Sequence, residues 1–477
     1  MESPETVRIY EVTGLTRLMS SLWVLAASES LHGWPARRIP LSSTLLATSV
    51  LGLEPYVGSV SNDSGELRVE TVSDRVVVVG SSLGGVVAAN ELRRAGIRVL
   101  VISNGVRDVY GLLGLGEEGE YLKQLAGIEP VDGYYVGLYD EGHAFVASDT
   151  LYVTRGPVVY AAGAEQPPPI ALNNDLPGIV SANYGAEIVA ELGYRPRRVI
   201  VLGYGYLAPR VADWLASRGV ETRLVALKGA VPEKPEKAEL VETRGVKGFA
   251  GENRVEAVVL EDGERLEADM VVSALGIYPD SPPVYAAGYP PIYVGDCYRF
   301  VPELPGPGTD IAERSYLVAA GMAIGYEWLD AVIASARYAA ALVAYSMKRI
   351  GEGDVEHFYS ELREALGKRA KYCPRVSRPP IWLSGEISGL QFIDLDEDLV
   401  LYHVYSAWSK GYRTMETLKR ATGLGTGSDQ GRFSAASSAI ILSAISGIDA
   451  SEIGLFRPRP PYFAPEASLL ARAPTEW

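Results

Sequence analysis

The stretch from Asp74 to Gly85 reads Asp-Arg-Val-Val-Val-Val-Gly-Ser-Ser-Leu-Gly-Gly and decides the fold of the first half of the chain. The valines predict a buried strand, the glycines and serines a tight turn, and an amphipathic run to Arg94 a helix. The apolar run from Ile97 to Ser103 then predicts a second buried strand. This order indicates one βαβ unit with a glycine turn at the start of its helix.

The same order recurs at Arg197, which begins the run Arg-Arg-Val-Ile-Val-Leu-Gly-Tyr-Gly-Tyr-Leu-Ala and leads into a helix through Arg218. Between the two units, Leu151 to Ala164 predicts a strand, an Arg-Gly turn and a buried strand. After the second unit, Val255 to Leu260 and Arg265 to Leu266 predict a hairpin around Asp262-Gly263. The second unit is therefore expected to be inserted into the first.

The sequence predicts an α/β fold with two nested Rossmann-like FAD/NAD(P)-binding domains and a small helical C-terminal domain. The discontinuous first domain is expected over 73–165 and 276–350, with the inserted domain at 166–275 and the helical domain at 380–477. Residues 66–70 predict an edge strand, and the fold of 1–72 is otherwise left open.

Composition narrows the classes of partner. The chain has 477 residues and a formal net charge of -15, which argues against nucleic acid or an anionic membrane surface. The longest apolar runs, Leu41 to Leu53 and Leu329 to Tyr345, are too short or too interrupted for a membrane span. No secretory signal is evident, so a cytoplasmic location is expected.

The first glycine turn is the first candidate nucleotide site. A turn of this kind lets the backbone and the helix N-terminus approach a pyrophosphate. Its positions are Gly80, Ser82 with Leu83, and Gly85, so serine replaces the middle glycine. The second strand ends at Ser103-Asn104, where a ribose-binding carboxylate would be expected. The site could hold FAD or another adenine nucleotide (NAD(P) or ATP), with Ser103 and Arg107 reading a phosphate if one is present.

The second turn keeps its small residues better, at Gly203, Gly205 and Ala208. Its second strand ends at Ala226, with Lys228 just beyond and no acid. This pattern is compatible with a 2′-phosphorylated nicotinamide cofactor, with another nucleotide, or with an empty site.

The cysteines and histidines suggest no catalytic centre. Only Cys297 and Cys373 are present, which predicts neither a disulfide framework nor an iron–sulfur cluster built by this chain alone. The four histidines are scattered without a partner at a motif spacing. No catalytic residue is assigned.

The nesting of the two units resembles the glutathione-reductase type of flavoprotein. In that type, a strand ending in small residues returns the chain to the first domain, and a later Gly-Asp closes the flavin site. Here the resemblance assigns these places to Ala162-Gly163 and to Gly295-Asp296.

The C-terminal segment resembles the alpha subunit of heteromeric sarcosine oxidase and its relatives among dye-linked L-proline and opine dehydrogenases. The resemblance lies in Gln391 to Asp396, Lys419 to Arg432 and Phe456 to Tyr462. Some relatives carry four cysteines of a [2Fe-2S] centre here. The corresponding positions hold oxygen-bearing side chains, so no cluster and no metal are expected: Asp394, Asp396, Asp429 and Ser434.

The resemblance implies a subunit of an amine or amino-acid dehydrogenase or oxidase. In that family a beta subunit with its own FAD oxidises the amine, FMN lies at the subunit interface, and further small subunits can be present. The folate-binding half of the longest members is not represented here. The alternative is a pseudoenzyme that has lost its nucleotide and serves assembly. An NAD(P)H-dependent disulfide reductase is set aside because its chemistry needs a closely spaced cysteine pair.

Overall fold

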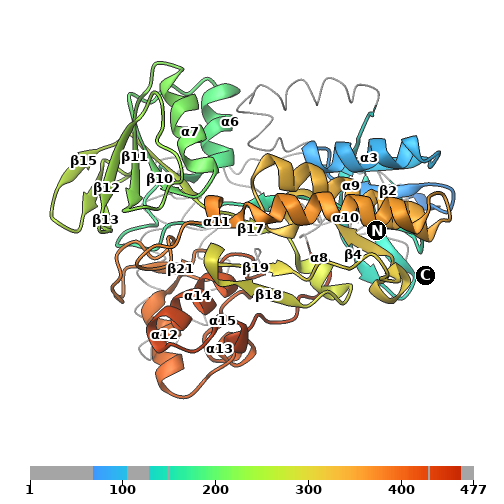
Figure 1. Ribbon diagram of the computed structural model, residues 1–477. Coiled ribbons are helices and arrows are strands. Elements are labelled where there is room, and N and C mark those ends of the chain that lie inside the picture. The colour runs from blue at the N-terminus through green and yellow to red at the C-terminus, as the bar shows by residue number, and fades with distance from the viewer. Residues whose placement is uncertain (1–67, 105–127, 148–149, 428–429, 463–477) are drawn as a thin grey trace, which may run out of the picture. The chain divides into compact units, whose positions relative to one another are not determined.

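The computed structural model in Figure 1 describes residues 68–104, 128–147, 150–427 and 430–462. Most of the N-terminal segment, residues 1–67, lies outside the described residues, as do Arg107 and Asp429. Within the described residues no helix is both long and apolar enough to cross a bilayer. The elements below all belong to the part of the chain from Leu67 onward.

The first domain is built on an eight-stranded sheet in the order β1-β6-β5-β4-β3-β2-β7-β20. Its parallel centre comprises β2 (Val76–Val79), β3 (Val99–Ser103), β7 (Val158–Tyr160) and β20 (Leu317–Ala319). The antiparallel part comprises β4 (Val131–Tyr139), β5 (Gly142–Ala147) and β6 (Thr150–Thr154). The predicted edge strand is confirmed as β1 (Arg68–Thr71), which pairs with β6.

Three helices form a layer on this domain. The helix α3 (Leu83–Arg94) packs against α9 (Leu329–Ser346), and α10 (Glu352–Gly367) packs against α9 in turn, so the three run side by side in Figure 1. The central helix α9 is rich in alanine and almost wholly buried, which allows close packing on both sides.

The inserted domain has a parallel five-stranded sheet in the order β12-β11-β10-β16-β9. The strands are β12 (Glu239–Thr243), β11 (Glu221–Leu227), β10 (Arg198–Tyr204), β16 (Met270–Leu275) and β9 (Ile179–Ser181). The helices α6 (Ala182–Ala190) and α7 (Leu207–Ala216) lie next to each other on one side of it in Figure 1. The predicted hairpin forms part of a small antiparallel sheet of β13 (Val246–Ala250), β14 (Ala257–Leu260) and β15 (Arg265–Glu267).

The insertion is confirmed by the path of the chain. The short strands β8 (Ala164–Glu165) and β17 (Tyr278–Pro279) pair antiparallel where the chain leaves the first domain and returns to it. After the return come α8 (Pro282–Ala286) and the hairpin of β18 (Pro291–Val294) and β19 (Arg299–Pro302).

The C-terminal region is largely helical, as expected. It begins after α11 (Arg369–Tyr372) and contains the strand pair β21 (Phe392–Asp394) and β22 (Leu399–Val400). Four helices follow, two of them short: α12 (Leu401–Ser409), α13 (Met415–Thr422), α14 (Ser434–Ser446) and α15 (Ala450–Ile453).

The expectation about the cysteines is wrong. Cys297 and Cys373, 76 positions apart, form a disulfide with their Cα atoms 4.8 Å apart. The bond joins the short 3₁₀ helix Gly295–Cys297 to the end of α11. The prediction rested on there being only two cysteines, but two are enough for one bond when the fold brings them together.

Candidate functional site

A cavity of about 300 Å³ opens at the first glycine turn, within the size range of small-molecule sites. It lies between the carboxyl ends of β2, β3 and β7 and the start of α6, which belongs to the inserted domain. Ligands of open α/β sheets bind at such strand ends. The structure brings these predicted site residues together on its lining: Gly80, Ser82, Ser103, Asn104, Ala162 and Gly163.

The turn is shaped by close backbone approaches. Gly80 has φ +99°, and a Cβ there would lie 2.3 Å from the carbonyl oxygen of Ala161. A Cβ on Gly85 would lie 2.0 Å from the carbonyl oxygen of Gly80. Gly85 and Leu83 therefore pack the helix onto the strand and do not line the cavity. Ser82 caps α3 and makes no side-chain capping bond, so its hydroxyl is not committed to the helix.

Hydroxyl groups stand at the end of β3, where a dinucleotide fold would place a carboxylate. The Ser81 hydroxyl donates to the Ser103 hydroxyl over 2.9 Å, and both residues line the cavity. A hydroxyl group is a weaker hydrogen-bond acceptor than a carboxylate for the two ribose hydroxyls. The serines nonetheless supply a polar wall at this end.

A carboxylate reaches the cavity from a different segment, which sequence reasoning missed. Asp280, just after β17, is buried and lines the cavity. Its Oδ2 accepts the Tyr160 hydroxyl at 3.1 Å, and its Oδ1 lies 3.4 Å from Nε of Arg432 but has no hydrogen-bond partner. Burial, and next the charge of Asp280, raise the pKa of Tyr160 well above its ordinary value, so the phenol stays protonated and donates. Asp280 thus retains a free lone pair for a ligand hydroxyl.

Gly295 and Asp296 do not line this cavity. They lie beside the second turn, where the Tyr204 hydroxyl donates to the Asp296 carbonyl and the Asp296 carboxylate pairs with Arg375 and Arg369. The strand that returns beside β7 is β20, and Met322 follows it on the cavity wall. Gly295 and Asp296 were assigned to the first site because they follow a later apolar strand. That local pattern does not show which later strand lies beside the first glycine turn.

The predicted residues of the second turn, Gly203, Gly205 and Ala208, lie together between β10 and α7. Gly203 is closely packed, since a Cβ there would stand 2.4 Å from Leu224. They are not among the residues that line the first cavity.

His143 has a structural role. Its Nε2 lies 2.6 Å from the carbonyl oxygen of Ser315, so Nε2 carries the proton and Nδ1 accepts the Tyr135 hydroxyl at 2.9 Å. Burial lowers the pKa of His143 to about 4, partly opposed by its bond to Ser315. The ring is neutral and fully engaged at neutral pH.

The stability of the fold should fall as pH drops from about 6.5 to about 4. In this window the unfolded chain protonates His143 and the folded chain does not, so proton uptake favours unfolding by up to roughly 3 kcal/mol. Urea unfolding at pH 7 and 4.5 measures the loss. The variant His143→Gln should lose less stability over the same interval, and an equal loss in both proteins would contradict this origin.

The C-terminal positions that the resemblance relates to iron–sulfur ligands carry oxygen-bearing side chains, which do not fit a cluster. Asp394 is buried and accepts the backbone N–H groups of Asp396, Glu397 and Gly425, so its oxygens hold the loop. Both cysteines are in the disulfide, which leaves no thiolate to bind iron. Within the described residues no group of three or more His, Cys, Asp or Glu is arranged to hold a metal ion.

The comparisons with known proteins agree with this architecture. Residues 388–473 match the sarcosine oxidase A3 domain, and residues 74–291 match the pyridine nucleotide-disulphide oxidoreductase family. The chain is 26% identical over 495 residues to sarcosine oxidase subunit alpha of Corynebacterium sp. strain P-1, covering 90% of this chain and 48% of that protein. The chain is similar to sarcosine oxidase alpha subunits.

A second sarcosine oxidase subunit alpha, from Rhizobium meliloti strain 1021, is 25% identical over 81% of this chain and 41% of its own length. The chain thus spans about half the length of the sarcosine oxidase alpha subunits it matches. Among solved structures, L-proline dehydrogenase from P. horikoshii has a TM-score of 0.68 at 22% identity, covering 86% of this chain and 82% of that chain. That likeness shows a shared fold.

Proposed function

We propose that this chain is the alpha-type subunit of a heteromeric flavin-dependent amine or amino-acid dehydrogenase or oxidase. It binds one adenine nucleotide, FAD, NAD(P) or ATP, in the cavity at the first glycine turn. The observation that carries the proposal is this cavity, joined in one chain to a C-terminal region that matches the sarcosine oxidase A3 domain. A beta subunit with its own FAD would carry the amine-oxidising site, and an FMN would lie at the interface.

The cavity residues fit an adenine nucleotide. The Gly80 turn and the start of α3 offer backbone N–H groups to phosphate, and the Ser81–Ser103 pair offers hydroxyls to the ribose. Asp280 offers a buried acceptor to a further hydroxyl. A flavin, when bound, supplies the redox chemistry, while these residues bind and orient the nucleotide and exclude water.

The position of the cysteine pair argues against the alternative of an NAD(P)H-dependent disulfide reductase. Its chemistry requires the cysteine pair beside the flavin. The disulfide of Cys297 and Cys373 is buried and is not among the residues that line the cavity.

The test is to purify the full chain with the proteins that accompany it, denature the complex, and identify the released small molecules by mass spectrometry. One adenine nucleotide per chain and a co-purifying FAD-containing amine oxidase are expected. Amine oxidation by the chain alone would overturn the proposal. A complex whose alpha chain releases no nucleotide would favour the pseudoenzyme alternative, which Ser82 and Ser103 support.

Asp280→Asn should weaken nucleotide retention about tenfold, because a neutral amide accepts a ligand hydroxyl less strongly than a carboxylate. The amide oxygen can still accept the Tyr160 hydroxyl, which preserves the local packing. Equilibrium dialysis measures the change in nucleotide affinity, after the bound nucleotide has been removed and then added back. The matched control is Asp262→Asn in the exposed hairpin turn, and equal affinities in the two variants would count against a role for Asp280.

A further inference from the structure

The second glycine turn holds a carboxylate of the chain itself. Glu327 is fully buried, and the backbone N–H of Tyr206, just before α7, donates to its Oε1 over 3.3 Å. A Cβ on Gly205 would stand only 2.7 Å from the same oxygen, so the carboxylate lies directly against this glycine. In dinucleotide folds the second glycine of the turn is where the pyrophosphate approaches the backbone.

A buried arginine balances this carboxylate. Nη2 of Arg299 lies 3.7 Å from Oε1 of Glu327, and the exposed fractions of the two side chains are 1% and 0%. Arg299 also donates to the carbonyl oxygens of Gly325 and Cys297, which fixes its position. Burial raises the pKa of Glu327, and the charge of Arg299 opposes that shift. A guanidinium stays charged in proteins, so the pair supplies its own counter-charge.

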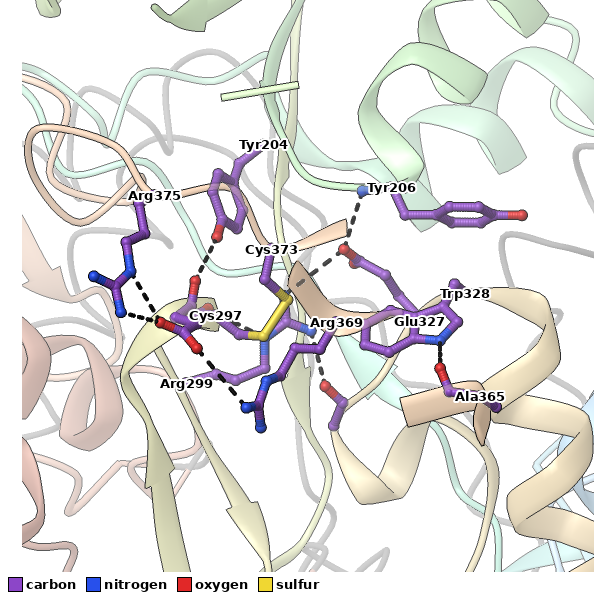
Figure 2. The surroundings of a disulfide bond; sticks show 12 residues. Tyr204, Tyr206, Cys297, Arg299, Glu327, Trp328, Ala365, Arg369, Cys373 and Arg375 are labelled. Atoms are coloured by element: carbon purple, nitrogen blue, oxygen red, sulfur yellow. Dashed lines mark hydrogen bonds and ion pairs between the residues drawn. A yellow bond between two sulfur atoms is a disulfide. The ribbon is translucent and has the colours of Figure 1, made fainter. Parts of the chain in front are cut away.

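A second segment covers the same turn. The carbonyl oxygen of Tyr372 would lie 3.1 Å from a Cβ on Gly205, and its ring packs edge-on against Tyr206. The next residue, Cys373, is bonded to Cys297, whose carbonyl accepts from Arg299. Figure 2 draws the disulfide together with the Arg299, Glu327 and Tyr204 side chains. The disulfide therefore ties the Tyr372 segment to the short helix Gly295–Cys297, whose last carbonyl accepts from Arg299.

We propose that Glu327 is a built-in substitute for a dinucleotide pyrophosphate, so that the second nucleotide fold is closed to NAD(H) and NADP(H). The position, the helix N-terminus and the close glycine are those of a pyrophosphate site, and the carboxyl group of Glu327 already occupies it. The first turn differs, because Gly80 and Ser82 border an open cavity. This inference rests on the proposed function. If the second fold is closed, no nicotinamide bound to the inserted domain delivers hydride to a flavin in the first cavity. Reducing equivalents reach this chain through a partner.

Hydrogen exchange on the unmodified full chain tests the closure. With saturating NADH or NADPH, peptides covering 203–216 should show no added protection. Saturable protection of those peptides would overturn the proposal. Added protection of peptides covering 80–94 would indicate binding in the first cavity, and it tests only the proposed function. The closure of the second fold and the proposed function can therefore fail independently.

A variant tests the substitution itself. Glu327→Ala leaves Arg299 and the Tyr206 N–H without their anion, so formate, a carboxylate small enough for the vacated space, should raise the melting temperature of this variant by roughly 2 °C or more beyond its effect on the wild type. The control Glu239→Ala removes one exposed carboxylate and should respond as the wild type does. An equal response of all three proteins would contradict the substitution. If Glu327→Ala does not fold, the exchange experiment on the wild type remains decisive.

Discussion

Arg299→Met should lower the free energy of unfolding by about 3–5 kcal/mol, because it leaves a buried carboxylate without its counter-charge. Arg299 is 1% exposed and pairs with Glu327, which is 0% exposed. Methionine fills most of the space, so the loss comes from the missing counter-charge and from the hydrogen bonds that Arg299 donates to the carbonyl oxygens of Gly325 and Cys297. Urea unfolding of the purified chain at pH 7 measures it.

The control for this prediction is Arg223→Met. Arg223 pairs with Glu239 at 2.8 Å, but the two side chains are 35% and 63% exposed, so its loss should stay below about 1 kcal/mol. The double variant Arg299→Met with Glu327→Gln should recover part of the stability, since no buried charge then remains. Similar losses in Arg299→Met and Arg223→Met would show that the buried pair does not stabilise the fold.

Removing the disulfide by Cys297→Ala together with Cys373→Ala should cost roughly 4 kcal/mol, the chain-entropy value for a loop of this length. The bond spans 76 positions and joins the β18–β19 region to the segment after α10. The unfolded chain gains freedom when the link is absent. Urea unfolding of the variant and the wild type gives the difference.

A dithiol reductant provides the matched test. Unfolding the wild type in its presence should reproduce the stability of the double alanine variant, and the variant itself should not respond. Alkylation of the denatured, unreduced chain should label neither cysteine. Labelling of both cysteines would show that the bond does not form.

Local patterns predicted the nested architecture correctly. The valine run of β2 and the apolar run of β10 each precede a glycine turn and an amphipathic helix, and such periodicity is a property of adjacent residues. The same reasoning identified the turn residues Gly80 and Ser82 and the strand end at Ser103, all of which line the cavity. It did not identify Asp280, because no local signal shows that the return strand of the inserted domain ends beside the first turn.

The sequence by itself determined the two βαβ units, the insertion of one into the other and the loss of the ribose-binding acids, since these depend on periodicity and spacing over short stretches. Only the tertiary structure decided which turn is open. Glu327 reaches Gly205 from 122 positions along the chain, and Cys373 reaches Cys297 from 76. Contacts at such separations are set by how whole domains pack, and a linear pattern carries no record of that packing.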